Sequence, residues 1–200
     1  MTLLNVKDYR TPDYPIEDLL LERWSARAMS GEALEPDQLM RAFEAARWAP
    51  SAGNLQDRFF LYAYRDTPAF DHFYSLLDEG NQSWCHKASV LIVAFSDTLR
   101  PSGKANHRHA FDTGMAVQNL LLQCSAMGLV GHAMAGFSYE RAAIELNMPE
   151  RFKPQCMIAI GHHGDPSELS EYNQGREKPS QRKPISEIIH EGAFEEEKNE

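Results

Sequence analysis

The residues with the clearest chemical potential lie in one short segment, Arg23-Trp24-Ser25-Ala26-Arg27. Alternate residues of an extended segment point the same way, so the two arginines and the serine can converge on one ligand. Arginine offers a planar fork of donors and serine adds a hydroxyl, a combination suited to a phosphate monoester. The alternative is a solvated helix end. The spacing alone leaves both hypotheses open.

A second segment places small and polar residues where a helix is expected to stop. It reads AARWAPSAGNLQ at positions 45–56, and Pro50 should end the helix. The small residues would let a ligand approach the backbone. Ser51, Asn54 and Gln56 could present hydroxyl and amide groups to the edge of a heteroaromatic ring, or they could only cap backbone groups in a turn.

Six stretches together resemble the nitroreductase family of FMN-dependent oxidoreductases, and the second of them is the most specific. They are ERWSAR (22–27), EAARWAPSAGNLQ (44–56), GNQSW (80–84), DTGMAVQNLLLQCSAMGL (112–129), AGF (135–137) and RKPISEII (182–189). The resemblance spans most of the chain. It implies an α+β fold in which helices flank a central, mostly antiparallel sheet, with a long central helix at a dimer interface and a C-terminal arm. It also implies a two-fold homodimer that binds FMN at the subunit interface.

The resemblance further implies which residues meet the cofactor. Arg23 and Ser25 would hold the FMN phosphate, and Arg27 would lie beside N1 and the C2 carbonyl of the flavin. Reduction accumulates negative charge on that edge, so Arg27 is the implied catalytic residue. The other implied cofactor-binding residues are Trp24, Pro50, Ser51 and Asn54, then Asn81 at the polar ring edge, Met134, Ala135 and Gly136 near N5, and Arg182 and Lys183 at the phosphate.

The activity implied by this resemblance is hydride transfer from NAD(P)H through flavin N5 to an electron-poor acceptor such as a nitroaromatic or a quinone. Donor and acceptor would use the same flavin face in turn, which gives ping-pong kinetics. Two alternatives stay open. One is a flavin-binding or sensing module without efficient NAD(P)H turnover, and the other is a flavin-dependent dehydrogenase or dehalogenase on the same fold.

The chain departs from the family's pattern at three places. Asp57-Arg58 replaces a Pro-Trp pair, and Trp24 replaces the second basic residue before the serine. We expect flavin binding to survive both changes. Ala135 stands where some members carry an acidic residue, which leaves open how nicotinamide or substrate packs there.

Other chemistries have weaker support in the sequence. His107, His109 and the pair His162-His163 could be metal ligands, but they match no recognised ligand spacing, so we expect no metal site. The motifs of α/β-hydrolases, P-loop NTPases and dinucleotide-binding Rossmann folds are absent. Cys124 and Cys156 fall in apolar segments and are expected to be inert core residues.

Composition narrows the class of protein. The chain has 200 residues and a net charge of −9, so it should repel nucleic acids, and its 42% hydrophobic content suits a globular core. Three cysteines without a C-x-x-C pair, and Lys7, Asp8 and Arg10 near the start, predict a cytoplasmic protein without a signal peptide. Glycines and polar residues interrupt the uncharged stretch 113–139, so we expect no membrane span.

Hydrophobic patterning predicts the elements that must position these residues. We expect strands at 59–64, 89–95, 129–135 and 155–161, with helices between them. The helix at about 108–127 carries apolar residues around its whole circumference, which predicts burial on all sides, partly against a second copy. We expect a single domain over 1–200, ordered from about 12 to 190, with an arm carrying Ile185, Ile188 and Ile189 packed on a surface and a solvated acidic tail at 191–200.

Overall fold

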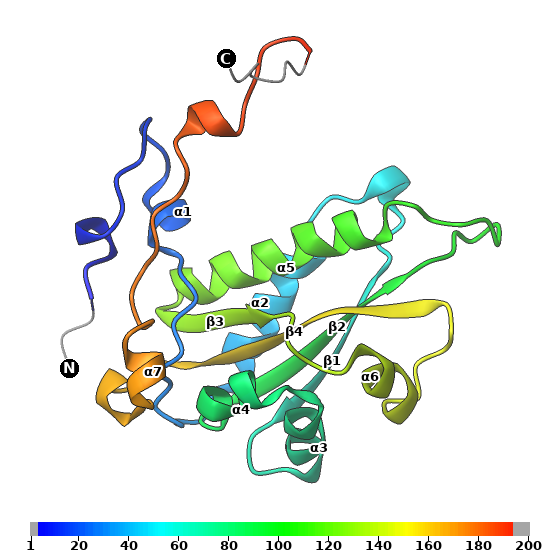
Figure 1. Ribbon diagram of the computed structural model, residues 1–200. Coiled ribbons are helices and arrows are strands. Elements are labelled where there is room, and N and C mark those ends of the chain that lie inside the picture. Colours follow the sequence, from blue (N-terminus) through cyan, green and yellow to red (C-terminus); the bar gives the residue numbers. More distant parts are fainter. Residues whose placement is uncertain (1–3, 194–200) are drawn as a thin grey trace, which may run out of the picture.

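A four-stranded antiparallel sheet forms the centre of the computed structural model, which describes residues 4–193 (Figure 1). Across the sheet the strands are β1 (Arg58–Tyr64), β2 (Val90–Asp97), β4 (Phe152–His162) and β3 (Leu129–Met134). Val93 of β2 lies opposite Met157 of β4, and His132 of β3 lies opposite Ala159. The α+β class and all four strands expected from the sequence are confirmed.

Helices cover both faces of the sheet (Figure 1). One face packs against α2 (Pro36–Arg47) and α5 (His109–Ala126), and the other against α3 (Pro68–Leu76), α4 (Glu79–Cys85) and α6 (Tyr139–Glu145). The alternation of β2 divides its side chains between the two cores: Ile92 faces α5, and Val93 faces α3. The short elements are α1 (Asp18–Glu22), α7 (Glu171–Gln174), η1 (Val6–Asp8), η2 (Ala52–Asn54), η3 (Pro166–Glu168) and η4 (Ile185–Glu187).

Local side chains set the starts of the helices near the site. Pro36 occupies the first turn of α2, where its missing N–H costs nothing. Thr67 caps α3 by accepting a hydrogen bond from the N–H of Phe70 at 3.2 Å. Asp78 caps α4 in the same way, accepting from the N–H of Asn81 at 2.9 Å. The cap on α4 fixes the backbone that carries Asn81.

α5 is enclosed on most sides but not on all of them within one chain. Leu120 is fully buried, but Phe111 is 69% exposed. Gly114, Gln118 and Ala126 continue an exposed stripe along the same side of the helix. Within residues 4–193 no other segment of the chain covers this stripe, so the predicted burial on all sides still requires the second copy that the sequence predicts there. Neither α5 nor any other helix within residues 4–193 has the length and apolar character needed to cross a membrane.

Both ends of the described chain project from the body as extended arms (Figure 1). The arms touch where the N–H of Ile185 donates to Asp13 Oδ2 at 2.7 Å. Ile188 and Ile189 are 69% and 63% exposed, so the expected packing of this apolar arm does not occur within one chain. Of the acidic tail expected at 191–200, residues 191–193 are exposed and residues 194–200 lie outside the described part.

Gly164, just after β4, lies against the backbone of the segment that carries Arg27. Its N–H donates to the carbonyl of Ala28 at 2.9 Å, and the N–H of Ser30 donates to the carbonyl of His162 at 3.0 Å. A Cβ atom at position 164 would lie 2.4 Å from the carbonyl carbon of Met29. Only glycine lets the two segments approach this closely.

We expect Gly164→Ala to lower the free energy of unfolding by about 1–3 kcal/mol, because the added methyl group must displace backbone rather than a flexible side chain. Denaturant titration measures the change. Gly175→Ala is the matched control, since Gly175 has helical φ and ψ of −60° and −20° and its added Cβ would lie 3.7 Å from the nearest atom. Equal unfolding midpoints for the two variants would contradict the close packing at Gly164.

Candidate functional site

Six cationic side chains line a cavity of about 300 Å³, here called the cationic cavity. None of them pairs with a carboxylate among the described residues. In a chain of net charge −9 this is a concentrated local excess of positive charge, which favours an anionic ligand. The six are Arg10, Arg23, Arg27, Arg176, Lys178 and Arg182.

Arg10 holds two walls of the cationic cavity together. Its guanidinium donates to the carbonyl oxygens of Leu21 and Arg23 at 2.6 and 2.9 Å, and to that of Ser180 at 3.0 Å. The side chain is only 8% exposed. These contacts join the extended segment after α1 to the C-terminal arm. On that segment Arg23 Nη1 donates to Ser25 Oγ at 3.2 Å, so the two predicted phosphate ligands lie side by side.

Glu177 fixes Arg27 through its backbone. The buried Glu177 carboxylate accepts the N–H of Arg27 at 2.9 Å to each oxygen, and the N–H of Ala28 at 2.9 Å. Charge-assisted hydrogen bonds of this kind are stronger than neutral ones. The carboxylate thus positions the start of one wall while leaving the guanidinium of Arg27 directed to the cavities.

The pKa values of Arg10, Arg23 and Arg27 in the cationic cavity are all lowered. Burial lowers the pKa of Arg23, and the charge of Arg182 lowers it further. Burial and then the charge of Arg176 lower the pKa of Arg27, against a smaller opposing effect of Glu177. Arginine stays protonated at neutral pH, so these shifts reflect, first, positive charges that are partly buried and, second, their repulsion of one another. A bound anion would relieve that repulsion.

A larger cavity, of about 590 Å³, adjoins the cationic cavity and shares Arg27, His132 and Arg176 with it. The backbone of residues 134–136 forms one edge. The N–H groups of Ala135 and Gly136 donate no hydrogen bond to the described residues, so both remain available to a ligand. Planar ring systems with polar edges are bound by such convergent backbone and side-chain groups.

Asn81 closes the same edge from α4. Its Nδ2 donates to the carbonyl of Gly136 at 2.9 Å, and its Oδ1 has no partner among the described residues. A Cβ atom at position 136 would lie 2.0 Å from Asp78 Oδ2 and 2.7 Å from Asn81 Nδ2. Glycine at 136 is therefore what allows the start of α4 to lie against this edge.

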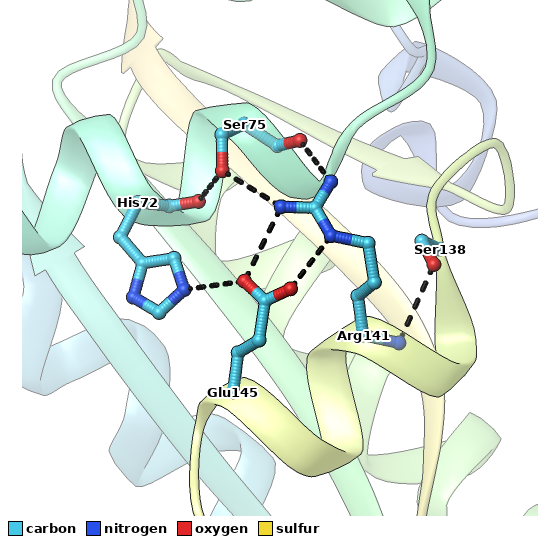
Figure 2. Close-up of polar contacts among 5 residues, drawn as sticks. All are labelled: His72, Ser75, Ser138, Arg141 and Glu145. Carbon is cyan, nitrogen blue, oxygen red and sulfur yellow. Dashed lines mark hydrogen bonds and ion pairs between the residues drawn. The ribbon is translucent and has the colours of Figure 1, made fainter.

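Polar contacts between α3 and α6 anchor the far side of this edge (Figure 2). Glu145 accepts from Arg141 Nε at 2.7 Å and lies 2.9 Å from His72 Nε2, while Arg141 Nη1 donates to the carbonyl of Ser75 at 2.9 Å. Ser138 caps α6 by accepting the N–H of Arg141 at 3.3 Å. Surface pairs of this kind contribute little singly, but together they tie the chain after Gly136 to α3.

The structure brings most of the sequence-predicted site residues into these two cavities. Predicted members of the cationic cavity are Arg23, Trp24, Ser25, Arg27 and Arg182, and predicted members of the larger cavity are Arg27, Asn81, Met134, Ala135 and Gly136.

Four predicted residues do not line either cavity. Lys183 lies outside both cavities, and its Nζ lies 3.3 Å from Glu187 Oε2. Pro50, Ser51 and Asn54 also line neither cavity in the single chain. Their loop is held at the start of α5, where Asp112 accepts the N–H of Ala52 at 2.9 Å.

Sequence reasoning missed several site residues. The dense charge of REKPSQRK at 176–183 could have pointed to Arg176 and Lys178. No local signal marked Arg10, Glu177 or His132, because each acts through a contact with a distant segment.

Metal ligation and thiol chemistry have no support at this site. Within residues 4–193 no three His, Cys, Asp or Glu side chains are grouped so as to hold a metal ion. Burial raises the pKa of both Cys124 and Cys156 to about 12, so both are neutral thiols at pH 7.

Known proteins share this sequence pattern and this fold. The model of the nitroreductase family matches residues 20–162.

A crystal structure of an oxidoreductase containing FMN is 37% identical, with a TM-score of 0.91 over 98% of this chain and 99% of that one. A candidate nitroreductase from Desulfovibrio desulfuricans, in complex with FMN, is 27% identical, with a TM-score of 0.70 over 97% and 100% of the two chains. A Streptococcus pyogenes serotype M6 protein, whose name proposes NAD(P)H nitroreductase activity, is 21% identical over 86% of this chain and 96% of its own. The family model matches well over half of the sequence, and this chain therefore belongs to the nitroreductase family.

Proposed function

We propose that this chain is an FMN-dependent oxidoreductase that takes hydride from NAD(P)H and delivers it to an electron-poor acceptor such as a nitroaromatic or a quinone. The observation that carries the proposal is the joined pair of cavities, one with six unpaired cations and the other edged by open N–H groups. FMN has the matching parts, a phosphate and a planar ring with polar edges. When bound, FMN supplies hydride acceptance and donation at its N5. The resemblance to an FMN-containing oxidoreductase supports this choice.

Residues of the cationic cavity would hold the phosphate. Arg23, Ser25 and Arg182 are the direct donors in this proposal, with Trp24 lining the same wall. Lys178 and Arg176 add positive charge around them. Arg10 and Glu177 act as positioning residues, because their own hydrogen bonds go to backbone. The wall is therefore assembled before any anion arrives.

Residues of the larger cavity would hold and polarise the flavin ring. Arg27 places a positive charge at the pyrimidine edge, where reduction adds negative charge, and so favours the reduced state. Asn81 Oδ1 is free to accept a hydrogen bond from a ring N–H. The open N–H groups of Ala135 and Gly136 would face N5. No general base is required of the protein for hydride transfer.

We also propose that two copies form the complete site. Phe111 on α5 and Ile188 on the C-terminal arm are large apolar side chains left exposed by the single chain. The predicted cofactor residues Pro50, Ser51 and Asn54 lie away from both cavities of their own chain. A second copy that covers α5 would bury the apolar groups and bring its own loop to the cofactor.

The absorption spectrum of the purified protein tests the proposed cofactor and donor. We expect a yellow protein whose flavin absorbance is bleached within seconds by NADH or NADPH under anaerobic conditions. Varied donor and acceptor should give parallel double-reciprocal lines, because the two substrates occupy the flavin face in turn. A folded protein that stays colourless with added FMN would refute the proposal. Reduction only by dithionite would favour a binding or sensing module instead.

Substitution of the two arginines should separate binding from redox tuning. Arg23→Ala should weaken FMN binding by about 1.5–3 kcal/mol, roughly 10- to 150-fold, because a charge-assisted phosphate contact is lost. Arg27→Ala should lower the flavin midpoint potential more than it lowers FMN occupancy. Arg41→Ala is the control, since Arg41 is an exposed arginine of α2 that lines neither cavity. Unchanged FMN affinity in Arg23→Ala would reject the phosphate assignment.

Analytical ultracentrifugation tests the proposed assembly. We expect the wild-type protein to sediment at twice the 22.7 kDa mass of one chain. Phe111→Glu should shift the equilibrium toward single chains, because it places a charge on the exposed stripe of α5. Glu140→Gln, an exposed change on α6, serves as the control. A single-chain mass for the wild type at micromolar concentration would overturn the two-copy site.

A further inference from the structure

His132 lies at the junction of the two cavities. Only Arg27, Arg176 and His132 line both of them. If the ring and the phosphate of one ligand occupy different cavities, the chain that links them must pass these three side chains. In FMN that link is a sugar alcohol with three hydroxyl groups.

Two contacts fix the ring of His132. Its Nδ1 lies 2.9 Å from the carbonyl oxygen of Ala26, and its ring packs against Trp84 with the centroids 4.5 Å apart and the ring planes tilted by 32°. A carbonyl oxygen can only accept, so Nδ1 must carry the hydrogen. In the neutral ring Nε2 is then left as a bare acceptor. Nε2 has no hydrogen-bond partner among the described residues.

The ring is neutral under ordinary conditions. Burial lowers the pKa of His132 to about 4, with the hydrogen bond to Ala26 opposing this and the charges of Arg27, Arg23 and Arg176 adding to it. The guanidinium groups of Arg27 and Arg176 can only donate. Of the three side chains at the junction, His132 alone can accept a hydrogen bond.

We infer that His132 Nε2 accepts a hydrogen bond from a hydroxyl of the sugar-alcohol chain, and that His132 thereby selects flavins that carry this chain over the bare ring. The inference rests on the proposed FMN function and deepens it. It assigns recognition of the sugar-alcohol chain, which links the ring to the phosphate, to a residue of β3. It is separate from the phosphate contact assigned to Arg23 and from the ring contacts assigned to Arg27 and Asn81.

Displacement of bound FMN from the holoprotein tests this assignment. Riboflavin, which has the hydroxyl chain without phosphate, and lumiflavin, which has neither, are titrated against the FMN-loaded protein, and released FMN is measured after ultrafiltration. His132→Asn keeps a donor near the position of Nδ1 but removes the acceptor. His132→Gln offers an acceptor near the position of Nε2.

We expect the wild type to prefer riboflavin to lumiflavin, and His132→Asn to lose that preference by about 2- to 12-fold, the usual range for one neutral hydrogen bond. His132→Gln should recover part of it. The preference for FMN over riboflavin should stay unchanged in His132→Asn and fall in Arg23→Ala. These opposite patterns separate the two contacts.

Three results would overturn the inference. One is an unchanged riboflavin-to-lumiflavin ratio in His132→Asn, and another is equal weakening of all three flavins, which would make His132 only a support for Trp84 and Ala26. The third is absence of flavin binding by the wild type, which would also end the proposed function. Failure confined to the His132 variants would leave the proposed function standing. Thermal unfolding of each variant shows whether the fold is retained.

Discussion

Mutual repulsion among six cationic side chains is the constraint on which the rest of this site depends. Two unit charges 4 Å apart repel by about 1 kcal/mol in water and about 4 kcal/mol near a protein surface, so such a cluster must be held by other contacts. Arg10 supplies three bonds to carbonyl oxygens, and Glu177 receives N–H groups from two successive residues. Both side chains are buried, and both join the segment after α1 to the C-terminal arm. The arm is therefore a structural part of the site and not an appendage.

The sheet supplies the rigid base for this assembly. The segment that carries Arg27 lies against β3 and β4 through the Ala26 contact to His132, the Ala28 contact to Gly164 and the Ser30 contact to His162. β4 is buried over most of its length, so these partners sit on a firm support. Two pairs of segments lie unusually close together in the site. Gly164 lies against the backbone of Met29, and Gly136 lies against Asp78 and Asn81 at the start of α4. Each contact is possible only because glycine has no side chain. The N–H of Gly164 is used within this packing, where it donates to the carbonyl of Ala28, whereas the N–H of Gly136 has no partner among the described residues.

The Asp57-Arg58 pair, one of the three departures from the family's pattern, makes local contacts that explain its place in the fold. Arg58 Nη2 donates to the carbonyl oxygens of Arg47 and Ala49 at 2.5 and 3.0 Å, and so satisfies backbone acceptors at the end of α2. Asp57 accepts a hydrogen bond from Asn106, and burial raises the pKa of this carboxyl group despite that bond. Arg58 thus ties the start of β1 to the chain that ends α2, just before the loop of residues 50–56, and Asp57 ties the end of that loop to Asn106. The loop itself is held by Asp112, which accepts the N–H of Ala52. It lines neither cavity of its own chain.

The sequence by itself determined the local elements and the family. Pro50 marked the end of a helix, apolar runs marked the four strands, and the spacing of Arg23, Ser25 and Arg27 marked residues that do share one cavity. The tertiary structure decided which distant groups join them. Arg10, Arg176 and Glu177 enter the site, Lys183 pairs with Glu187 outside both cavities, and the loop of Ser51 and Asn54 lines neither cavity. The reason is physical: helix and strand signals act over a few residues, whereas Glu177 meets the backbone of Arg27 across 150 positions. Such a contact depends on how the whole chain closes over the sheet, and no local pattern encodes it.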